Sequence, residues 1–298
     1  MKLKGLFADK SAGVQLLIFI GIFAVVTIVT LLLTTLLTVV LHVDMQARAP
    51  MLVMQAVSSL LMWGGSAAIA TYLFTCDSVF VYWKNNSVTF QWLLLGVIIF
   101  AFSMPTISLL AGWNEQLHLP ESLAKLEELM VKSEEAAREA TELLTGGSGV
   151  GLFLVELIVI AAIPALVEEL FFRGVMQNLM YRSTSNTHIA VWSTAVVFSL
   201  LHFQFFGFVP RMVMGAILGY LYHYGRSLWI NTTAHFFNNA IALSAYWIAA
   251  RVESLKDIQS ENLSVSVETV SASVLSLSIA VVLLWVMKRE IEEREKAD

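Results

Sequence analysis

The stretch SAGVQLLIFIGIFAVVTIVTLLLTTLLTVVL, residues 11–41, decides the fold class of this 298-residue chain. It contains no acidic or basic residue. It is also longer than the roughly 20 apolar residues that an α-helix needs to cross a bilayer core. The sequence therefore predicts a membrane-spanning helix here. The short basic stretch before it has no small-residue cleavage signature, so we expect an uncleaved first helix rather than a signal peptide.

The composition extends this prediction to the whole chain. Hydrophobic residues make up 57% and charged residues only 14%, and the mean hydropathy is +0.74. Soluble domains carry roughly a quarter charged residues, so a soluble enzyme and a disordered chain are both excluded. The net charge of −5 excludes a basic nucleic-acid-binding protein. The single cysteine, Cys76, excludes a disulfide scaffold and a cysteine-based zinc site within one chain, and we expect it to be a small apolar filler.

Further apolar segments predict an all-α, polytopic transmembrane helix bundle of about eight spans. After the first run, the spans are expected at residues 51–74, 91–111, 151–182, 187–206, 208–224, 227–249 and 270–287. Pro105 is expected to kink the third span. In the sixth span, Gly215 and Gly219 have the GxxxG spacing that permits close helix packing.

The segment 112–148 differs sharply, because it holds eight Glu against three Lys and Arg. Pro120 opens a helical pattern and the pair Gly146–Gly147 closes it. Its apolar residues recur at helical spacing: Leu123, Leu126, Met130, Ala137, Ala140 and Leu144. We predict one extramembrane acidic amphipathic helix within residues 120–144. It is either a lid or partner-binding helix, or a solvated helix that rests its apolar stripe on the membrane domain, and we favour the second role.

These features divide the chain into four parts. They are three N-terminal spans (1–111), the acidic helix (112–149), a membrane core (150–250), and a loop with the last span and a charged tail (251–298). With eight spans, eleven Lys and Arg lie on the side of the N-terminus and seven on the other. The positive-inside rule then predicts a multi-pass plasma membrane protein with both termini in the cytoplasm. The short, regular loops favour a prokaryotic source.

Ionisable groups inside a membrane span are costly, about 2.5–3.5 kcal/mol each on insertion scales, and most spans here avoid them. The segment PALVEELFFRG, residues 164–174, carries Glu168, Glu169 and Arg173. Glu169 and Arg173 are four residues apart and are expected to pair on one helix face. Glu168 points about 100° away, so the two carboxylates need not do the same work.

Two later spans carry polar residues at a similar depth. Phe198 and His202 lie one turn apart in the fifth span, and Asn231, His235 and Asn239 form one stripe in the seventh. Counted along the helices, Glu168, His202 and Asn239 lie about 20–22 Å from the cytoplasmic side, and His235 about 14 Å. We therefore expect a shared polar cavity.

The chemistry of this set fits hydrolysis of an amide bond. A carboxylate and an imidazole that face one water make a general-base pair, and a second His with an Asn offers N–H donors to an oxyanion. No Ser or Cys in a GxSxG-like context competes as nucleophile. A metal is the other option, because Glu168, His202 and His235 are an acceptable zinc set although HExxH is absent. The residues alone leave that choice open.

Taken together, three motifs follow one another on three predicted helices: EExxxR (Glu168, Glu169, Arg173), FxxxH (Phe198, His202) and HxxxN (His235, Asn239). Over about residues 150–250, this pattern resembles the CAAX protease and bacteriocin-processing family, also called the Abi family. That family includes the Ras-converting CAAX endopeptidase.

The resemblance implies an intramembrane endopeptidase. Glu168 and His202 would activate the attacking water, and His235 and Asn239 would form the oxyanion hole. Glu169 with Arg173 would shape the site, and Phe198 would pack beside His202. The family is catalogued as metal-dependent, but we favour Glu/His water activation over a tightly bound zinc. The expected partners are the bilayer and a peptide or protein substrate, lipidated or membrane-associated, that enters from the cytoplasmic side.

Two other classes of protein stay open. One is a non-catalytic membrane adaptor, such as a bacteriocin self-immunity or kinase-regulating protein. The other is a transporter that uses Glu168 and the two histidines as a proton relay, although no internal repeat supports an inverted-repeat transporter. For Glu169 and Arg173, a structural role that ties helices together is as well supported as a functional one.

Overall fold

The computed structural model describes residues 3–297 except 45, 76–87, 146, 148, 250 and 252–265. Within these ranges every regular element is a helix. The prediction of an all-α helical bundle is therefore confirmed for the described residues. Cys76 and Gly146 lie outside them.

The N-terminal part forms three rods. Helix α1 (Ala12–Val40) begins where the hydroxyl of Ser11 accepts a hydrogen bond from the backbone N of Val14 at 3.4 Å, as an N-cap does. The second rod is continuous and consists of α2 (Arg48–Ser59), η1 (Leu60–Gly65) and α3 (Ser66–Phe74). Helix α4 (Phe90–Asn114) forms the third rod and includes Pro105. The three predicted spans are present, with ends that differ by a few residues.

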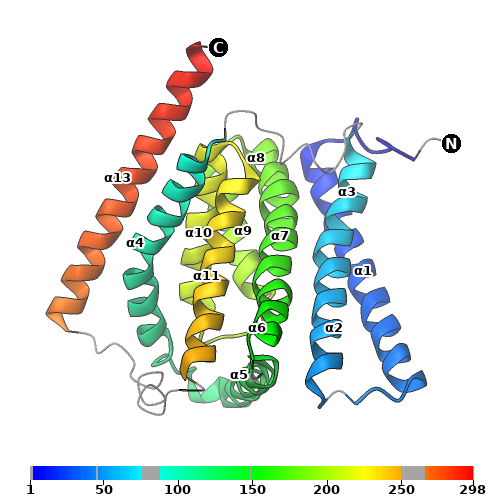
Figure 1. The fold of residues 1–298 in the computed structure, drawn as a ribbon. Coiled ribbons are helices and arrows are strands. Elements are labelled where there is room, and N and C mark those ends of the chain that lie inside the picture. Colours follow the sequence, from blue (N-terminus) through cyan, green and yellow to red (C-terminus); the bar gives the residue numbers. More distant parts are fainter. Residues whose placement is uncertain are drawn as a thin grey trace.

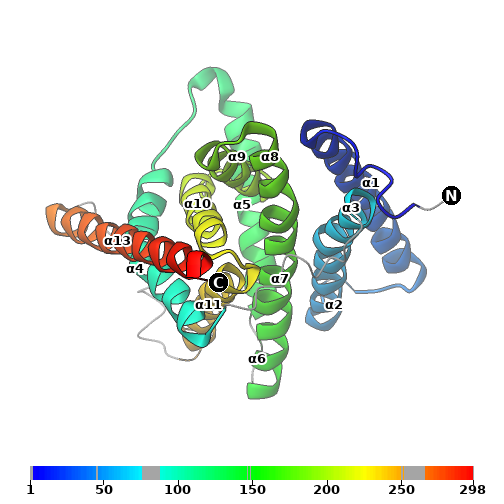
Figure 2. The ribbon, with the colours of Figure 1, turned by 90° about the horizontal axis from the view of Figure 1, so that it is seen from above.

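The acidic segment forms a short turn, η3 (Glu121–Leu123), followed by α5 (Ala124–Thr145). Helix α5 lies across the lower end of the bundle in Figure 1, and Figure 2 shows how it passes beneath the other helices. Along the predicted apolar stripe, Leu123 and Leu126 are exposed, whereas Leu144 is half-buried. The stripe therefore packs on the bundle only in its C-terminal half.

The fourth rod is one long helix with local changes of winding. It consists of α6 (Val150–Glu156), η4 (Leu157–Ala162), α7 (Ile163–Glu169), η5 (Leu170–Gln177) and α8 (Asn178–Thr184). Both η4 and η5 are π-helical, so the backbone N–H groups bond to carbonyls five residues back. All eight residues of η5 are buried. The sequence pattern predicted the length of this rod but not its π-helical turns.

The last four helices are α9 (Thr187–Leu200), α10 (Phe208–Gly225), α11 (Leu228–Ala249) and α13 (Val267–Ala297). Helix α9 ends six residues before the predicted limit of 206. The chain turns back there, with Phe203 at a φ of 54° and the Ser199 hydroxyl donating to the carbonyl of Phe208 at 2.6 Å. The predicted span was therefore too long, and His202 lies in this turn rather than within a helix.

Five rods among the described residues are long and apolar enough to cross a membrane: Ala12–Val40, Arg48–Phe74, Phe90–Asn114, Val150–Thr184 and Val267–Arg294. Helix α9 is a shorter apolar helix, and α10 and α11 are not among the five. These three helices lie among the long rods in Figure 1, and α9 and α11 still carry exposed apolar side chains such as Leu200 and Ile241. Of the eight predicted spans, five therefore meet the criterion of length and hydropathy among the described residues, and three do not.

The outer rods present apolar surface. Leu17 and Leu32 on α1 are 70% and 66% exposed, and Leu275 on α13 is 65% exposed. Exposed apolar surface of this extent indicates contact with another apolar phase, which for a polytopic bundle is lipid. Both described ends of the chain lie at the upper end of the bundle in Figure 1, opposite α5.

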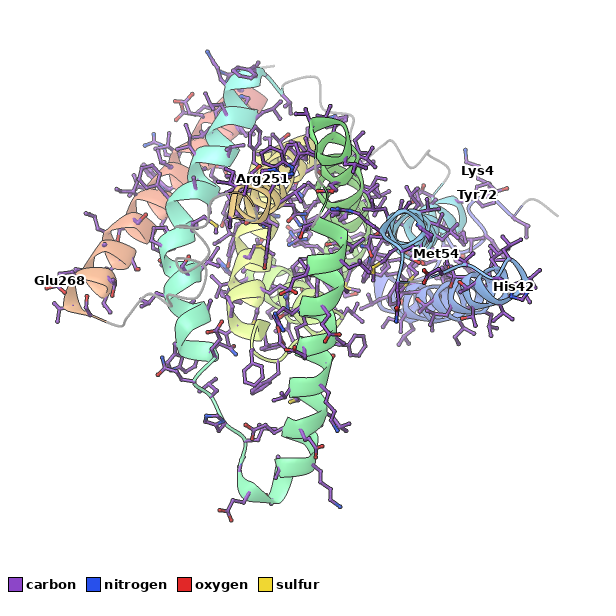
Figure 3. The ribbon with its side chains drawn as sticks, turned by 60° about the horizontal axis from the view of Figure 1, so that its bottom comes forward. Lys4, His42, Met54, Tyr72, Arg251 and Glu268 are labelled. Carbon is purple, nitrogen blue, oxygen red and sulfur yellow. The ribbon has the colours of Figure 1, made fainter. Side chains whose placement is uncertain are left out.

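Two groups of buried side chains hold the bundle together. One joins the rods of α1, α3 and η5, where Phe19, Phe171 and Phe172 pack with Phe198. Near its edge the backbone N of Gly5 donates to the carbonyl of Tyr72 at 2.9 Å, and Figure 3 labels Tyr72 beside Lys4. The second group joins α4, α10, α11 and α13 through residues that include Ile99, Leu218, Leu221, Ile230 and Met287.

Close packing between α10 and its neighbours depends on the two glycines of the GxxxG pattern. A Cβ atom at Gly219 would lie 2.8 Å from Oε1 of Gln177 and 3.0 Å from Cγ1 of Val191. A Cβ at Gly215 would lie 3.1 Å from Cδ1 of Phe198. The spacing in the sequence predicted this close approach.

We expect Gly219→Leu to lower the melting temperature of the detergent-purified protein by several degrees, because overpacking costs about 1–3 kcal/mol. Gly21→Leu is the matched control, since nothing lies within 4 Å of a Cβ at Gly21. Thermal unfolding followed by intrinsic tryptophan fluorescence measures both variants. Equal melting temperatures for the two would contradict the packing argument.

Candidate functional site

Glu169 is the centre of a buried hydrogen-bond network that joins three helices. Its side chain is fully buried at the C-terminal end of α7. Oε1 accepts hydrogen bonds from Nη1 of Arg173 and from Nδ1 of His235, each at 2.8 Å, and Oε2 accepts one from Nδ2 of Asn231. The predicted pair of Glu169 and Arg173 is therefore present in the structure.

Arg173 extends this network to α10 and to the aromatic side chains. Its Nη2 donates to the carbonyl of Gly215 at 2.7 Å. Its Cζ lies 5.0 Å from the ring centroid of Phe198. The Phe198 ring in turn lies 4.9 Å from the ring of His202 and 6.2 Å from that of His235, both in edge-on geometry. Phe198 thus separates and orients the two histidines.

A cavity of about 560 Å³ lies beside this network. Glu168, His202, His235 and Asn239 all line it. The expected shared polar cavity therefore contains all four residues, although they come from α7, from the turn after α9 and from α11.

Glu168 and Glu169 occupy different environments although they are adjacent. Glu169 is sealed inside the network, whereas Glu168 keeps 9% of its surface exposed and lines the cavity. No described residue donates a hydrogen bond to the Glu168 carboxylate, but it interacts electrostatically with His235 and Arg211. This difference follows from the 100° step between successive helical residues.

The hydrogen bonds of the two histidines define which ring nitrogens are free. Nδ1 of His202 lies 2.7 Å from the carbonyl of Phe198. A carbonyl only accepts, so Nδ1 carries the proton and Nε2 is the acceptor in the neutral ring. By the same argument, Nδ1 of His235 carries a proton because it faces the Glu169 carboxylate. Each ring is thus left with Nε2 as the nitrogen without a protein partner.

Asn239 lines the cavity next to Asn238. Nδ2 of Asn238 donates to Oδ1 of Asn239 at 3.1 Å. With its oxygen engaged in this way, Asn239 has its Nδ2 group available as a donor. This arrangement suits the binding of a negatively charged oxygen.

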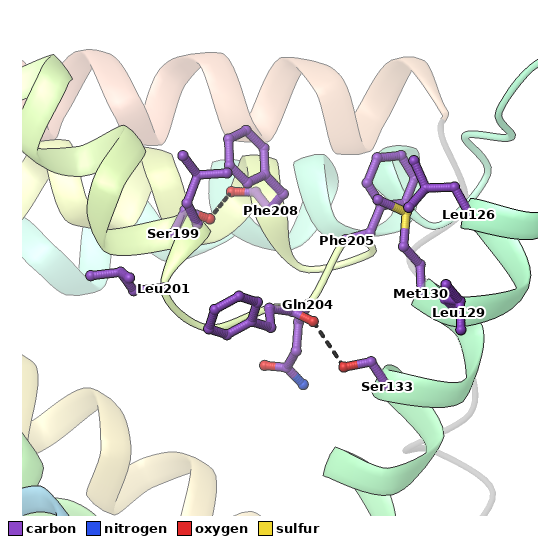
Figure 4. Close-up of a pocket in the computed structure, with 11 residues that line it drawn as sticks. Leu126, Leu129, Met130, Ser133, Ser199, Leu201, Gln204, Phe205 and Phe208 are labelled. Atoms are coloured by element: carbon purple, nitrogen blue, oxygen red, sulfur yellow. Dashed lines mark hydrogen bonds between the residues drawn. The ribbon is translucent and has the colours of Figure 1, made fainter. Parts of the chain in front are cut away.

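The turn that carries His202 is held from several sides. The Ser133 hydroxyl of α5 donates to the carbonyl of Phe203 at 3.1 Å, as Figure 4 shows together with the Ser199 bond to Phe208. Nδ2 of Asn114, at the end of α4, donates to the carbonyl of Phe205 at 2.9 Å. These contacts fix the position of His202 without a helix around it.

Between α5 and this turn lies a second, largely apolar groove of about 460 Å³. Leu126, Leu129 and Met130 of α5 line it together with Phe205, as seen in Figure 4. Phe203 lines it as well. The exposed half of the α5 stripe therefore faces an open groove rather than the packed bundle.

Helix α5 also borders the cavity itself, through Thr141 and Thr145. Its C-terminal end is fixed by arginines. Nη2 of Arg48 donates to the carbonyl of Leu144 at 2.6 Å, and Nη2 of Arg251, labelled in Figure 3, donates to the carbonyl of Gly147 at 2.8 Å. Helix α5 therefore contacts the membrane domain at its C-terminal end and borders the cavity there.

The cavity lies in the half of the bundle next to α5. Its lining comes from the α5-side ends of α2, α4, α10 and α11, through residues such as Gln55, Ile107, Pro210 and Tyr246. The described chain ends lie at the opposite end. If both termini are cytoplasmic, as we predicted, the cavity lies in the half of the bundle away from the cytoplasm.

Arg211 is a cavity residue that the sequence analysis missed as part of the site. It had been assigned only as a loop charge in the count for membrane orientation. In the sequence, the position of Arg211 just after Pro210, at the start of a predicted span and near Gly207, could have indicated a charged residue at the site. Nearby on α5, burial raises the pKa of Glu134 above its ordinary value, and the charge of Arg211 opposes this rise.

A small apolar pocket of about 200 Å³ adjoins the cavity between α4 and α11. Phe100 and Met104 contribute one side and Phe237 and Ile241 the other. Asn238 and Ala242 line both this pocket and the polar cavity. An apolar group could therefore bind next to the polar site.

The donor set does not fit a tightly held metal ion. Within the described residues, no three His, Cys, Asp or Glu side chains come together as ligands. Glu169 accepts hydrogen bonds from Arg173, Asn231 and His235 and is therefore not available as a ligand. The alternative set Glu168, His202 and His235 shares a cavity but does not form a ligand cluster.

Two comparisons with known proteins each gave a match. Residues 150–241 match the family model described as type II CAAX prenyl endopeptidase Rce1-like. An uncharacterized protein of Bacillus subtilis (strain 168), YpbD, is 30% identical over 89 residues. That alignment covers 28% of this chain and 42% of YpbD, so it spans less than half of the relative. No solved structure matches.

We expect Glu169→Ala to lower stability by about 3–5 kcal/mol, because it leaves the buried Arg173 without its partner. Glu168→Gln is the adjacent control and should unfold close to the wild-type temperature, since its carboxylate holds no described hydrogen bond. Thermal unfolding in detergent measures both. Similar losses in the two variants would show that Glu168 is also a structural group.

Proposed function

Because residues 150–241 match the model of the Rce1-like family of CAAX prenyl endopeptidases, we propose that this protein is an intramembrane endopeptidase that hydrolyses a peptide bond without a tightly bound metal. The observation that carries the proposal is that Glu168, His202, His235 and Asn239 line one cavity. The family match covers about the same residues as the three motifs. It supports peptidase chemistry, whereas the residue roles below are our assignments.

Glu168 and His202 act as the base. The carboxylate of Glu168 and Nε2 of His202 are both free to accept, so a water between them donates its protons to these two groups. As the water oxygen attacks the carbonyl carbon of the substrate, one of its protons passes to this pair. The C–O bond forms, and the carbonyl oxygen becomes a tetrahedral oxyanion.

His235 and Asn239 stabilise the oxyanion. Asn239 donates through Nδ2, because its Oδ1 already accepts from Asn238. His235 donates through Nε2 in its imidazolium form, since Nδ1 is engaged with Glu169. The carboxylate of Glu169 supports that positive charge. Preorganised donors of this kind contribute about 2.7–4 kcal/mol each to the transition state.

Collapse of the tetrahedral intermediate completes the reaction. The C–N bond breaks, and the leaving nitrogen takes the proton that the pair of Glu168 and His202 received from the water. The products are an amine and a carboxylic acid. Glu169, Arg173 and Phe198 hold the site but transfer no proton in this scheme.

The substrate is a peptide or protein segment in or beside the membrane. The cavity lies among helices that border lipid, and the apolar pocket next to Asn238 would accommodate a lipid chain or an apolar side chain. Helix α5 lies over the same cavity, so it acts as a lid that the substrate has to pass or displace.

We expect Glu168→Gln and His202→Ala to abolish cleavage of a quenched-fluorescence peptide library by the detergent-purified protein. Asn239→Ala should lower kcat by about 10²–10³ through loss of an oxyanion donor. His188→Ala and Glu128→Gln are matched controls, because His188 bonds to Tyr220 outside the cavity and Glu128 is exposed on α5. Cleavage that survives both base substitutions would overturn the assigned roles. A biological role that Glu168→Gln leaves intact would favour the adaptor.

We also expect cleavage to persist when a zinc-specific chelator is added, because the scheme draws on side chains alone. The rate is measured before and after dialysis against the chelator, and again after zinc is returned. Loss of activity with recovery at one zinc per protein would contradict the metal-free scheme.

A further inference from the structure

Arg211 is a cation of the cavity that forms no direct ion pair with a described carboxylate, although the more distant charges of Glu134 and Glu168 act on it. Its Nη2 donates to Oε1 of Gln204 at 2.6 Å. Its Nη1 is buried and has no hydrogen-bond partner among the described residues. No described carboxylate lies within 4.0 Å of the guanidinium, which sets it apart from Arg173, whose charge is fully paired. A buried donor without a hydrogen-bond partner is costly unless a ligand supplies one.

Neighbouring residues orient the guanidinium group of Arg211. The guanidinium packs on Gly207, where a Cβ would lie 3.0 Å from Nη2 and 3.1 Å from Nη1. Gln204 lies between Arg211 and Glu134, since Nε2 of Gln204 donates to Oε1 of Glu134 at 3.2 Å. The neutral amide therefore holds the guanidinium in place while it keeps the acidic helix from neutralising it directly.

The position of Arg211 relates it to the reaction centre. Arg211 stands in the first turn of α10, one helical turn before Gly215, whose carbonyl binds Arg173. Four residues correspond to about 6 Å along the axis, so Arg211 lies on the α5 side of the network around Glu169. The first turn of a helix adds partial positive charge at the same place. Glu168 is the carboxylate of the same lining.

We propose that Arg211 determines specificity by binding a carboxylate of the substrate on the α5 side of the scissile bond. A guanidinium with a free Nη1 offers a charge-assisted hydrogen bond to a carboxylate. The carboxylate is either the free C-terminus of the peptide or the side chain of an Asp or Glu. This inference rests on the proposed function, because it places the substrate in the same cavity.

Peptide binding tests Arg211 separately from catalysis. Three fluorescent peptides share one apolar sequence and end in a free carboxylate, in an amide, or in an amide with one internal Asp. Their dissociation constants are measured on full-length protein that carries Glu168→Gln, which keeps the peptides intact. We expect at least one acidic peptide to bind about tenfold more tightly than the neutral amide, and the two acidic peptides distinguish a C-terminus from a side chain.

Variants of Arg211 complete the test. Adding Arg211→Gln should abolish the preference for acidic peptides, Arg211→Lys should retain most of it, and Arg211→Glu should reverse it in favour of a Lys-containing peptide. Arg138→Gln, an exposed arginine of α5 paired with Glu135 and Glu142, should leave the preference unchanged. Equal binding of all three peptides, or a preference that survives Arg211→Gln, would overturn the proposal. A protein that binds acidic peptides through Arg211 but cleaves none would instead refute the endopeptidase function.

Discussion

The buried charge of Glu169 is the constraint on which the rest of the site depends. A carboxylate that is fully removed from solvent has to be compensated, and here Arg173, Asn231 and His235 all donate to it. Because these partners come from the same long rod and from α11, and because Arg173 also binds the backbone of α10, one charge fixes three helices relative to one another. The cavity and its catalytic candidates take their positions from that junction.

The division of work between two adjacent carboxylates follows from helix geometry alone. Glu169 faces inward, and both of its carboxylate oxygens accept hydrogen bonds from neighbouring side chains. Glu168 lines the cavity and is the carboxylate that we propose as part of the base. The same rule applies to the imidazoles, since each uses Nδ1 for support and has Nε2 left for the reaction. In the proposed scheme, the atoms that hold the site together are therefore not the atoms that react with the substrate.

Much of the fold and of the cavity could be predicted from the sequence because helical periodicity and long uncharged runs carry that information. The paired Glu169 and Arg173, the shared depth of the polar residues and the close approach at Gly219 all follow from spacing along a helix. The turn around His202 could not be predicted, because contacts with Ser133 and Asn114, distant in sequence, end α9 early. Arg211 was missed because its role depends on which helix ends meet, and a charge at the end of a span is ordinarily solvated.

The π-helical winding of η5 has a consequence for how the chain tolerates changes in length. In a π-helical turn one more residue is accommodated per turn than in an α-helix, so η5 holds a residue that ordinary winding would leave out. Deleting a single residue between 170 and 177 would not loosen this segment but would let it rewind as an α-helix. Side chains beyond the deletion would then keep nearly the same direction relative to Glu169, whereas the same deletion in a wholly α-helical stretch would turn them by about 100°. This rod should therefore tolerate a one-residue deletion within η5 better than one in its α-helical parts.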